Sequence, residues 1–162
     1  AGGQAACRLR RQNSGDEEHS TSAISRTTES VSLILADTSV WVAHFRRANP
    51  LLQSLLANGQ VLCHPLIVIE LACGTPPAPR ERTIGDLRKL QQAVVATTDE
   101  TLALIDKEQL HDSGCGAIDM ALLASARLTL GALLWALDKN LHTLSARLGV
   151  AFSADAHQRP VS

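Results

Sequence analysis

The chain has 162 residues, 45% of them hydrophobic, and a formal net charge of −1. This composition is typical of one globular domain with a buried core. The near-neutral charge excludes a generic basic nucleic-acid coat protein, although a few local arginines could still bind phosphates. We find no stretch apolar enough for a membrane span or a signal peptide, and the four cysteines lack zinc-site spacing. We therefore expect a cytoplasmic protein with reduced thiols.

Composition also predicts the domain limits. Residues 1–30 are rich in Ser, Thr, Arg and Gly and show no apolar periodicity, which is typical of a disordered tail. The folded domain is expected over residues 31–153, and residues 154–162 are expected to form a loose C-terminal end.

The first half of the folded domain alternates strands with helices. Ser32–Ala36 is a short apolar run, as expected of a strand buried on both faces. Asn49 and Pro50 open a helix as N-cap and first-turn proline, and Gly59 closes it. The other elements predicted in this half are a helix ending near Arg47, a strand at Gln60–Cys63, a helix from Pro65 to Gly74 and a helix from about Arg80 to Gln92.

The second half continues the alternation. Its predicted elements are a strand at Val94–Thr97, a helix capped by Thr98 and reaching about Asp112, a helix from Ala117 to Leu130, a strand at Ala132–Leu137, a helix to Gly149 and an edge strand at Val150–Phe152. This order predicts an α/β fold, with a mostly parallel sheet of four to five strands and helices on both faces. In such sheets ligands bind beyond the carboxyl ends of the strands.

Two acidic residues follow predicted strands. Asp37 comes directly after the first apolar run, and Asp138 comes directly after Ala132–Leu137. An Asp at such a position is often only a helix N-cap. Two of them at equivalent strand ends, each with apolar neighbours, also indicate a shared site at one edge of the sheet.

Two further acids lie in apolar helices. The helical neighbours of Glu70 are Leu66, Ile67, Cys73 and Gly74. A buried carboxylate needs a partner, and no Lys or Arg lies within a turn, so we expect a cation there unless the helix ends early enough for Glu70 to reach water. Asp119 has a similar setting, with N-terminal capping as the simpler alternative.

Convergence of the four acids would require a cation. Two carboxylates about 4 Å apart repel by roughly 4 kcal/mol at an effective dielectric near 20, and a divalent ion would remove this cost. Oxygen ligands favour Mg²⁺ or Mn²⁺ over Zn²⁺.

Four segments resemble the motifs of PIN domains, and of VapC-type toxins in particular. They span nearly all of the predicted folded domain, from about Leu33 to Phe152, in the expected order. The segments are Leu33–Trp41 (LILADTSVW), Cys63–Gly74 (CHPLIVIELACG), Ile118–Ala126 (IDMALLASA) and Leu133–Leu141 (LLWALDKNL).

The resemblance implies a single-domain parallel-sheet nuclease, usually a homodimer, which a small antitoxin protein inhibits. It implies that the catalytic and metal-binding quartet is Asp37, Glu70, Asp119 and Asp138. It also places Thr38 or Ser39 beside the site, and Asn140 near the fourth acid. One departure is Ala136, because relatives often carry Thr or Ser at that position.

The expected reaction is Mg²⁺- or Mn²⁺-dependent hydrolysis of an RNA phosphodiester, giving 5′-phosphate and 3′-hydroxyl ends. The principal alternative is a catalytically silent PIN-like module that only binds RNA or protein. An aspartyl-nucleophile phosphatase would need a second Asp two residues after Asp37, where this chain has Ser39.

Overall fold

The structure is a computed structural model that describes residues 32–157. The tail predicted over residues 1–30, and the last residues of the loose end predicted from 154, lie outside this range. Within it, no helix is both long and apolar enough to span a bilayer.

A parallel sheet forms the centre of the described chain. Its strands are β1 (Leu33–Ala36), β2 (Val61–Cys63), β3 (Gln91–Gln92) and β4 (Ala132–Trp135), in the order β3-β2-β1-β4. All three strand pairings are parallel. The chain therefore builds the sheet in one direction from β1 to β3 and then returns to the other side of β1, so the strand order reverses between β1 and β4. This arrangement confirms the predicted α/β class.

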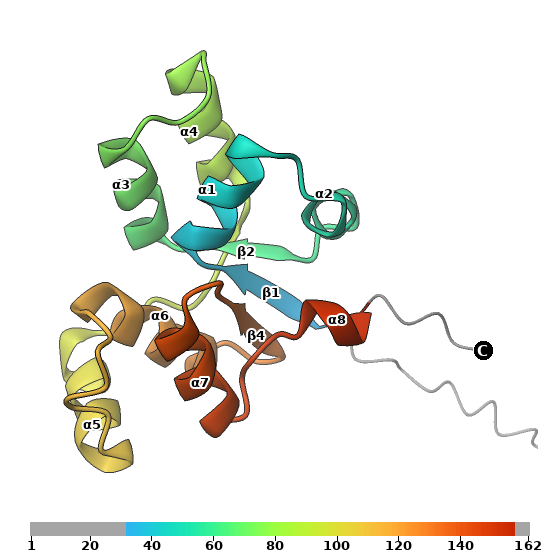
Figure 1. Ribbon diagram of the computed structural model, residues 1–162. Coiled ribbons are helices and arrows are strands. Elements are labelled where there is room, and N and C mark those ends of the chain that lie inside the picture. The colour runs from blue at the N-terminus through green and yellow to red at the C-terminus, as the bar shows by residue number, and fades with distance from the viewer. Residues whose placement is uncertain (1–31, 158–162) are drawn as a thin grey trace, which may run out of the picture.

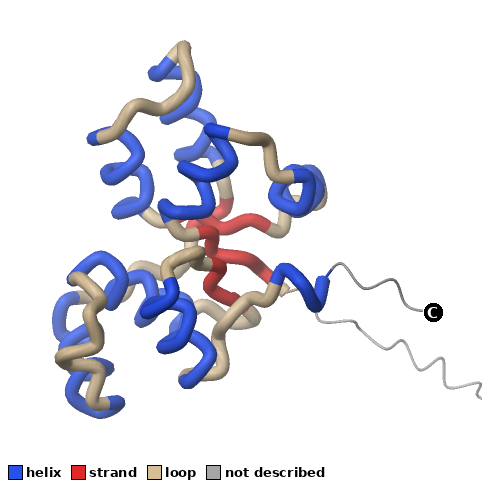
Figure 2. The backbone as a smooth tube through the Cα atoms, viewed as in Figure 1, coloured by secondary structure: helices blue, strands red, loops and turns tan. Residues whose placement is uncertain are grey.

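Helices cover both faces of the sheet, as Figures 1 and 2 show. The helices before β3 lie on one face, and the next three helices after it lie on the other. The first group contains α1 (Thr38–Arg46), α2 (Pro50–Ala57), α3 (Pro65–Cys73) and α4 (Arg80–Lys89), and the second contains α5 (Thr98–Glu108), α6 (Ala117–Leu128) and α7 (Lys139–Arg147).

The core lies between the sheet and these two helix layers. Ile34 and Leu35 of β1 are fully buried, and they point to opposite faces because side chains alternate along a strand. Ile67 of α3 and Leu122 of α6 are fully buried as well, in the same apolar cluster. Burying both faces of β1 explains why its sequence is continuously apolar.

Helix starts follow from local capping. The Asn49 side chain accepts hydrogen bonds from the backbone N–H groups of Leu51 and Leu52, and Pro50 occupies the first turn, as predicted. In α5 the N-cap is Thr97 rather than the predicted Thr98. Thr97 and Glu100 form a reciprocal capping box, and only Thr97 has a Glu three residues later.

The strand predicted at Val94–Thr97 is wrong in position, since β3 is Gln91–Gln92. Pairing with β2 ends at the bond from the Ala93 N–H to the Cys63 carbonyl, 2.9 Å long. Beyond it, the Val94 N–H donates to the Thr129 hydroxyl at 2.9 Å instead of to a strand. The apolar run was misleading because Val94 and Val95 are about half exposed.

The end of the described chain also differs from expectation. The edge strand predicted at Val150–Phe152 is reduced to a single parallel bridge between Leu134 and Ala151. The region expected to be loose begins with a short helix, α8 (Ala154–His157).

Candidate active site

Asp37 lies where β1 ends and α1 begins. Its side chain is 6% exposed, and its Oδ2 accepts hydrogen bonds from the Ser39 N–H at 3.1 Å and the Ser39 hydroxyl at 2.6 Å. These bonds make Asp37 the N-cap of α1. Both use Oδ2, and Oδ1 makes no hydrogen bond to any residue from 32 to 157. One carboxylate oxygen is therefore fixed while the other is left for a ligand.

Ser39 also joins the two loops at the carboxyl edge of the sheet. Its Oγ accepts a hydrogen bond from the Leu137 N–H at 3.0 Å, and the Asp37 N–H donates to the Trp135 carbonyl at 2.9 Å. These bonds hold the segment that follows β4 against the segment that follows β1. Ala136, where a hydroxyl was expected from the resemblance, is buried in this segment.

Asp138 is the N-cap of α7. Its Oδ1 accepts a hydrogen bond from the Leu141 N–H at 2.9 Å, and its side chain is exposed. It does not follow β4 directly, as the sequence suggested, because that strand ends at Trp135.

Glu70 lies in α3, on the layer that contains α1. Its Oε2 accepts a hydrogen bond of 2.6 Å from the hydroxyl of Thr38, the residue that follows Asp37. No ion pair involving Glu70 forms within the described range. The Thr38 hydroxyl thus joins Glu70 to the Asp37 loop, and the cation expected at Glu70 stays a prediction.

Asp119 approaches from the opposite helix layer, in the first turn of α6. Its Oδ2 accepts a hydrogen bond from the Gly116 N–H at 2.8 Å, so it does cap the helix start. Burial raises the pKa of the Asp119 carboxyl; the Gly116 bond lowers it, and the negative charges of Asp37 and Asp138 raise it further. The three aspartates are therefore close enough to interact electrostatically, although they come from three separate segments.

A glycine loop packs beside these acids. Gly114 has a φ of +79°, and a Cβ built there would lie 2.8 Å from Asn140 Nδ2, so a side chain at this position would require Asn140 to move. This contact places Asn140, in the first turn of α7, beside the loop that precedes Asp119.

The position of these acids in the sheet favours ligand binding. They gather at the carboxyl edge, where the strand order reverses between β1 and β4, which is the usual ligand-binding position in open parallel sheets.

Comparison with known proteins agrees with this fold. The family model described as "PIN domain" matches residues 34–146. The chain is also 42% identical over 123 residues to "Ribonuclease VapC32" of Mycobacterium tuberculosis, in the CDC 1551 / Oshkosh and H37Rv strains alike, covering 76% of this chain and 98% of that protein. The chain belongs to the PIN domain family. The resemblance to VapC-type members is confirmed by the sequence match to these relatives.

One solved structure is also similar to this PIN domain. It is the crystal structure of PAE2754 from Pyrobaculum aerophilum, with a TM-score of 0.47 and 16% identity, over 74% of this chain and 90% of that one. The family assignment rests on the sequence matches.

Metal binding in this PIN domain can be tested against its donor set. Among residues 32–157, no three His, Cys, Asp or Glu side chains already stand as a metal cage. The available donors are carboxylate oxygens. Burial raises the pKa of the Asp119 carboxyl, and the negative charges of Asp37 and Asp138 raise it further. This set fits a hard divalent ion that keeps several of its waters and contacts part of the quartet through them. The residues therefore fit Mg²⁺ or Mn²⁺.

Sequence reasoning missed one neighbour of the acids. Burial raises the pKa of the Cys115 thiol, and so do the negative charges of Asp119 and Asp138. Cys115 is a free thiol and is only partly buried. Its place four residues before Asp119, in the loop that leads into α6, was the available signal.

Proposed function

We propose that the protein is a metal-dependent endoribonuclease, the toxin of a type II toxin–antitoxin pair, in which Asp37, Glu70, Asp119 and Asp138 hold the metal. Membership of the PIN domain family and likeness to VapC ribonucleases support the ribonuclease activity. The observation that carries the site assignment is geometric: the Ser39 hydroxyl bonds both Asp37 and the backbone beside Asp138, at the carboxyl edge of the sheet. The charges of both aspartates also contribute to the raised pKa of Asp119.

The proposed reaction is hydrolysis of an RNA phosphodiester. A bound Mg²⁺ or Mn²⁺ would lower the pKa of a water and offset negative charge on the phosphate. The water oxygen attacks phosphorus and the P–O3′ bond breaks, which leaves a 5′-phosphate on one product and a 3′-hydroxyl on the other.

The protein's own contribution is to orient the carboxylates. Ser39 fixes one oxygen of Asp37, and Thr38 fixes one oxygen of Glu70. Outer hydrogen bonds of this kind set the direction and basicity of metal ligands. We expect Asn140, which lies beside the Gly114 loop, to contact the phosphate near Asp138.

The proposal includes partners and location. By family membership we expect a small antitoxin protein and a homodimer, and we expect the protein to act in the cytoplasm. Exposed apolar side chains offer surface for such contacts; among them are Ile69, Val95, Leu102 and Leu137, each more than half exposed.

The decisive test is metal-dependent cleavage of single-stranded RNA. The purified protein should cleave with Mn²⁺ or Mg²⁺ and lose cleavage on addition of EDTA. Asp37→Asn should abolish cleavage because the neutral amide is a far weaker ligand for a hard cation. Asp106→Asn, at an exposed position of α5, is the matched control and should cleave normally.

Calorimetry separates the nuclease from a silent binding module. Wild-type protein should bind Mn²⁺ and Asp37→Asn should bind it more weakly, with circular dichroism showing both folded. Failure of the wild type to bind Mn²⁺ or to cleave RNA would favour the silent module.

A further inference from the structure

A cavity of about 500 Å³ opens beside the acids, between α1, α3 and the loop at residues 74–77. Thr38 and Glu70, which are hydrogen-bonded to each other, line one end of it. The cavity therefore begins at the proposed metal site, and its volume lies in the range of small-ligand pockets.

One stripe of α1 forms a wall of this cavity. Thr38, Val42, Phe45 and Arg46 all line it, and their spacing of four, seven and eight residues puts them on one helix face. Eight residues of α-helix correspond to roughly 12 Å. The wall thus runs from a polar end at Thr38, past apolar side chains, to the cationic end at Arg46.

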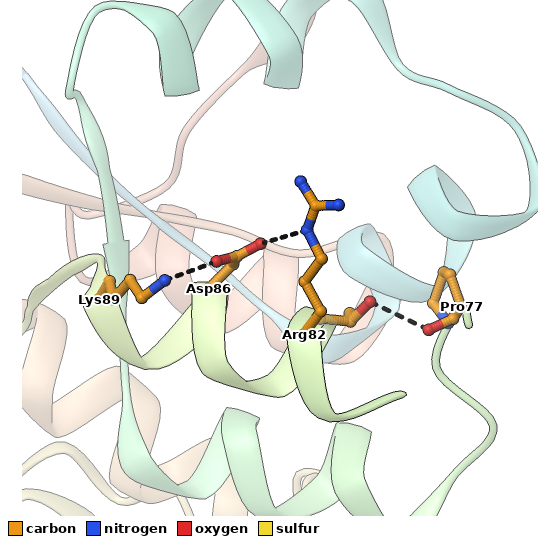
Figure 3. A network of polar contacts seen from close by, with 5 residues as sticks. Pro77, Arg82, Asp86 and Lys89 are labelled. Atoms are coloured by element: carbon orange, nitrogen blue, oxygen red, sulfur yellow. Dashed lines mark hydrogen bonds and ion pairs between the residues drawn. The ribbon is translucent and has the colours of Figure 1, made fainter. Parts of the chain in front are cut away.

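The loop that forms the opposite wall is held by hydrogen bonds. Pro76 is buried, and the Pro77 carbonyl accepts a bond from the Thr83 hydroxyl at 3.0 Å. Figure 3 shows Pro77 close to α4, where Asp86 also lies between Arg82 and Lys89. The Arg80 guanidinium donates to the Ala72 carbonyl at 2.6 Å. These contacts make the cavity a preformed feature.

Arg46 has the properties of an anion-binding group. It is exposed and forms no ion pair with any residue in the described range. A guanidinium suits phosphate because it can donate two parallel hydrogen bonds. The apolar middle of the cavity, with Val42, Phe45 and Pro76, suits the flat face of a base.

We propose that this cavity is a nucleotide subsite of the ribonuclease. It holds the nucleotide adjacent to the scissile phosphate, with the base against Val42, Phe45 and Pro76 and a neighbouring phosphate at Arg46. This inference rests on the proposed function. An RNA nucleotide is favoured over a protein segment because Glu70 itself forms part of the cavity, so the occupant is continuous with the group being cleaved.

The first test compares two adjacent arginines. Arg46→Gln should raise the KM for a short single-stranded RNA about tenfold and change kcat little, because the lost contact is made in both the ground and transition states. It should also reduce the salt slope of log KM by about 0.7, the value for one phosphate contact on a single strand. Arg47→Gln is the control, since Arg47 does not line the cavity.

The second test examines the base. Val42→Phe should fill the middle of the cavity and raise the KM for intact RNA. It should change the KM little for RNAs that carry an abasic residue next to the cleavage site, tested with the abasic residue on the 5′ side and on the 3′ side in turn. Thermal melting of each variant verifies its folding.

The outcomes are distinguishable. If wild-type protein cleaves RNA but Arg46→Gln and Arg47→Gln have the same KM, the subsite is overturned and the ribonuclease stands. If both cavity variants keep the wild-type KM but lose a co-purifying small protein, the cavity is a partner site, which also overturns the proposal. Absence of cleavage by the wild type would overturn the ribonuclease and the subsite together.

Discussion

The Ser39 hydroxyl links two parts of the proposed site, and the substitution Ser39→Ala removes this hydroxyl with little other change. This hydroxyl donates to Asp37 Oδ2 at 2.6 Å and accepts from the Leu137 N–H at 3.0 Å. Loss of the hydroxyl breaks a charge-assisted hydrogen bond to the buried Asp37 carboxylate. It also breaks the hydrogen bond to the Leu137 N–H, and among the described residues no other side-chain bond joins Ser39 to the segment after β4.

The magnitude follows from the two bonds. A hydrogen bond to a charged group contributes about 1.5–3 kcal/mol. The bond to Leu137 contributes less because Leu137 is exposed and water can replace the hydroxyl. We expect the free energy of unfolding to fall by about 2 kcal/mol. RNA cleavage should fall about 10- to 100-fold, as for other losses of a group that orients a metal ligand.

Urea denaturation and RNA cleavage with Mn²⁺ measure the two effects. Ser54→Ala, at an exposed position of α2, is the matched control and should change neither. Ser39→Thr retains the hydroxyl and should recover most of the activity. If Ser39→Ala keeps wild-type cleavage and loses less than about 0.5 kcal/mol, the range for neutral surface substitutions, the proposed role of Ser39 is refuted.

Two further predictions concern stability. Burial lowers the pKa of His64, whose Nδ1 accepts from the Leu66 N–H and caps α3, so the unfolded state binds more protons and stability should fall as pH drops below 6.5. When the free energy of unfolding is measured by denaturation from pH 7.5 to 5, His64→Asn should make it less dependent on pH. Some dependence should remain, because burial lowers the pKa of His44 too. An unchanged slope of this free energy against pH would contradict the role of His64. Gly114→Ala should lower the free energy of unfolding by about 1–2 kcal/mol because of its left-handed backbone, with a smaller addition because the exposed Asn140 side chain must move. Adding Asn140→Ala should restore only the part of the stability that was lost to the contact with Asn140. Full recovery of stability in melting experiments would show that the backbone at residue 114 is unstrained.

Much of the fold could be predicted because its signals are local. Asn49 and Pro50 open α2 as expected, and Asp37 and Asp138 follow a strand region and cap the next helix. Such features depend on residues within one turn, so the sequence contains them directly. The family resemblance likewise came from short runs around each acid.

The position of β3 could not be predicted in this way. Val94 and Val95 have strand-forming side chains, but a strand exists only where a neighbour supplies hydrogen bonds, and β2 offers its last carbonyl at Cys63. The side chains of Thr129 and Ser125 take the next backbone donors instead. Strand limits therefore depended on the partner strand and on α6.

The candidate site likewise combines features that the sequence predicted with features that depend on tertiary contacts. Residue order indicated four acids in apolar settings, and the family resemblance added Thr38 or Ser39 and Asn140 as neighbours. Only the tertiary structure decided that the Thr38 hydroxyl bonds Glu70, and that Arg46 lies at the far end of a cavity that begins at Glu70. The physical reason is that hydrogen bonds and charge interactions act over a few ångströms in space, and packing of the two helix layers on the sheet sets which side chains come that close.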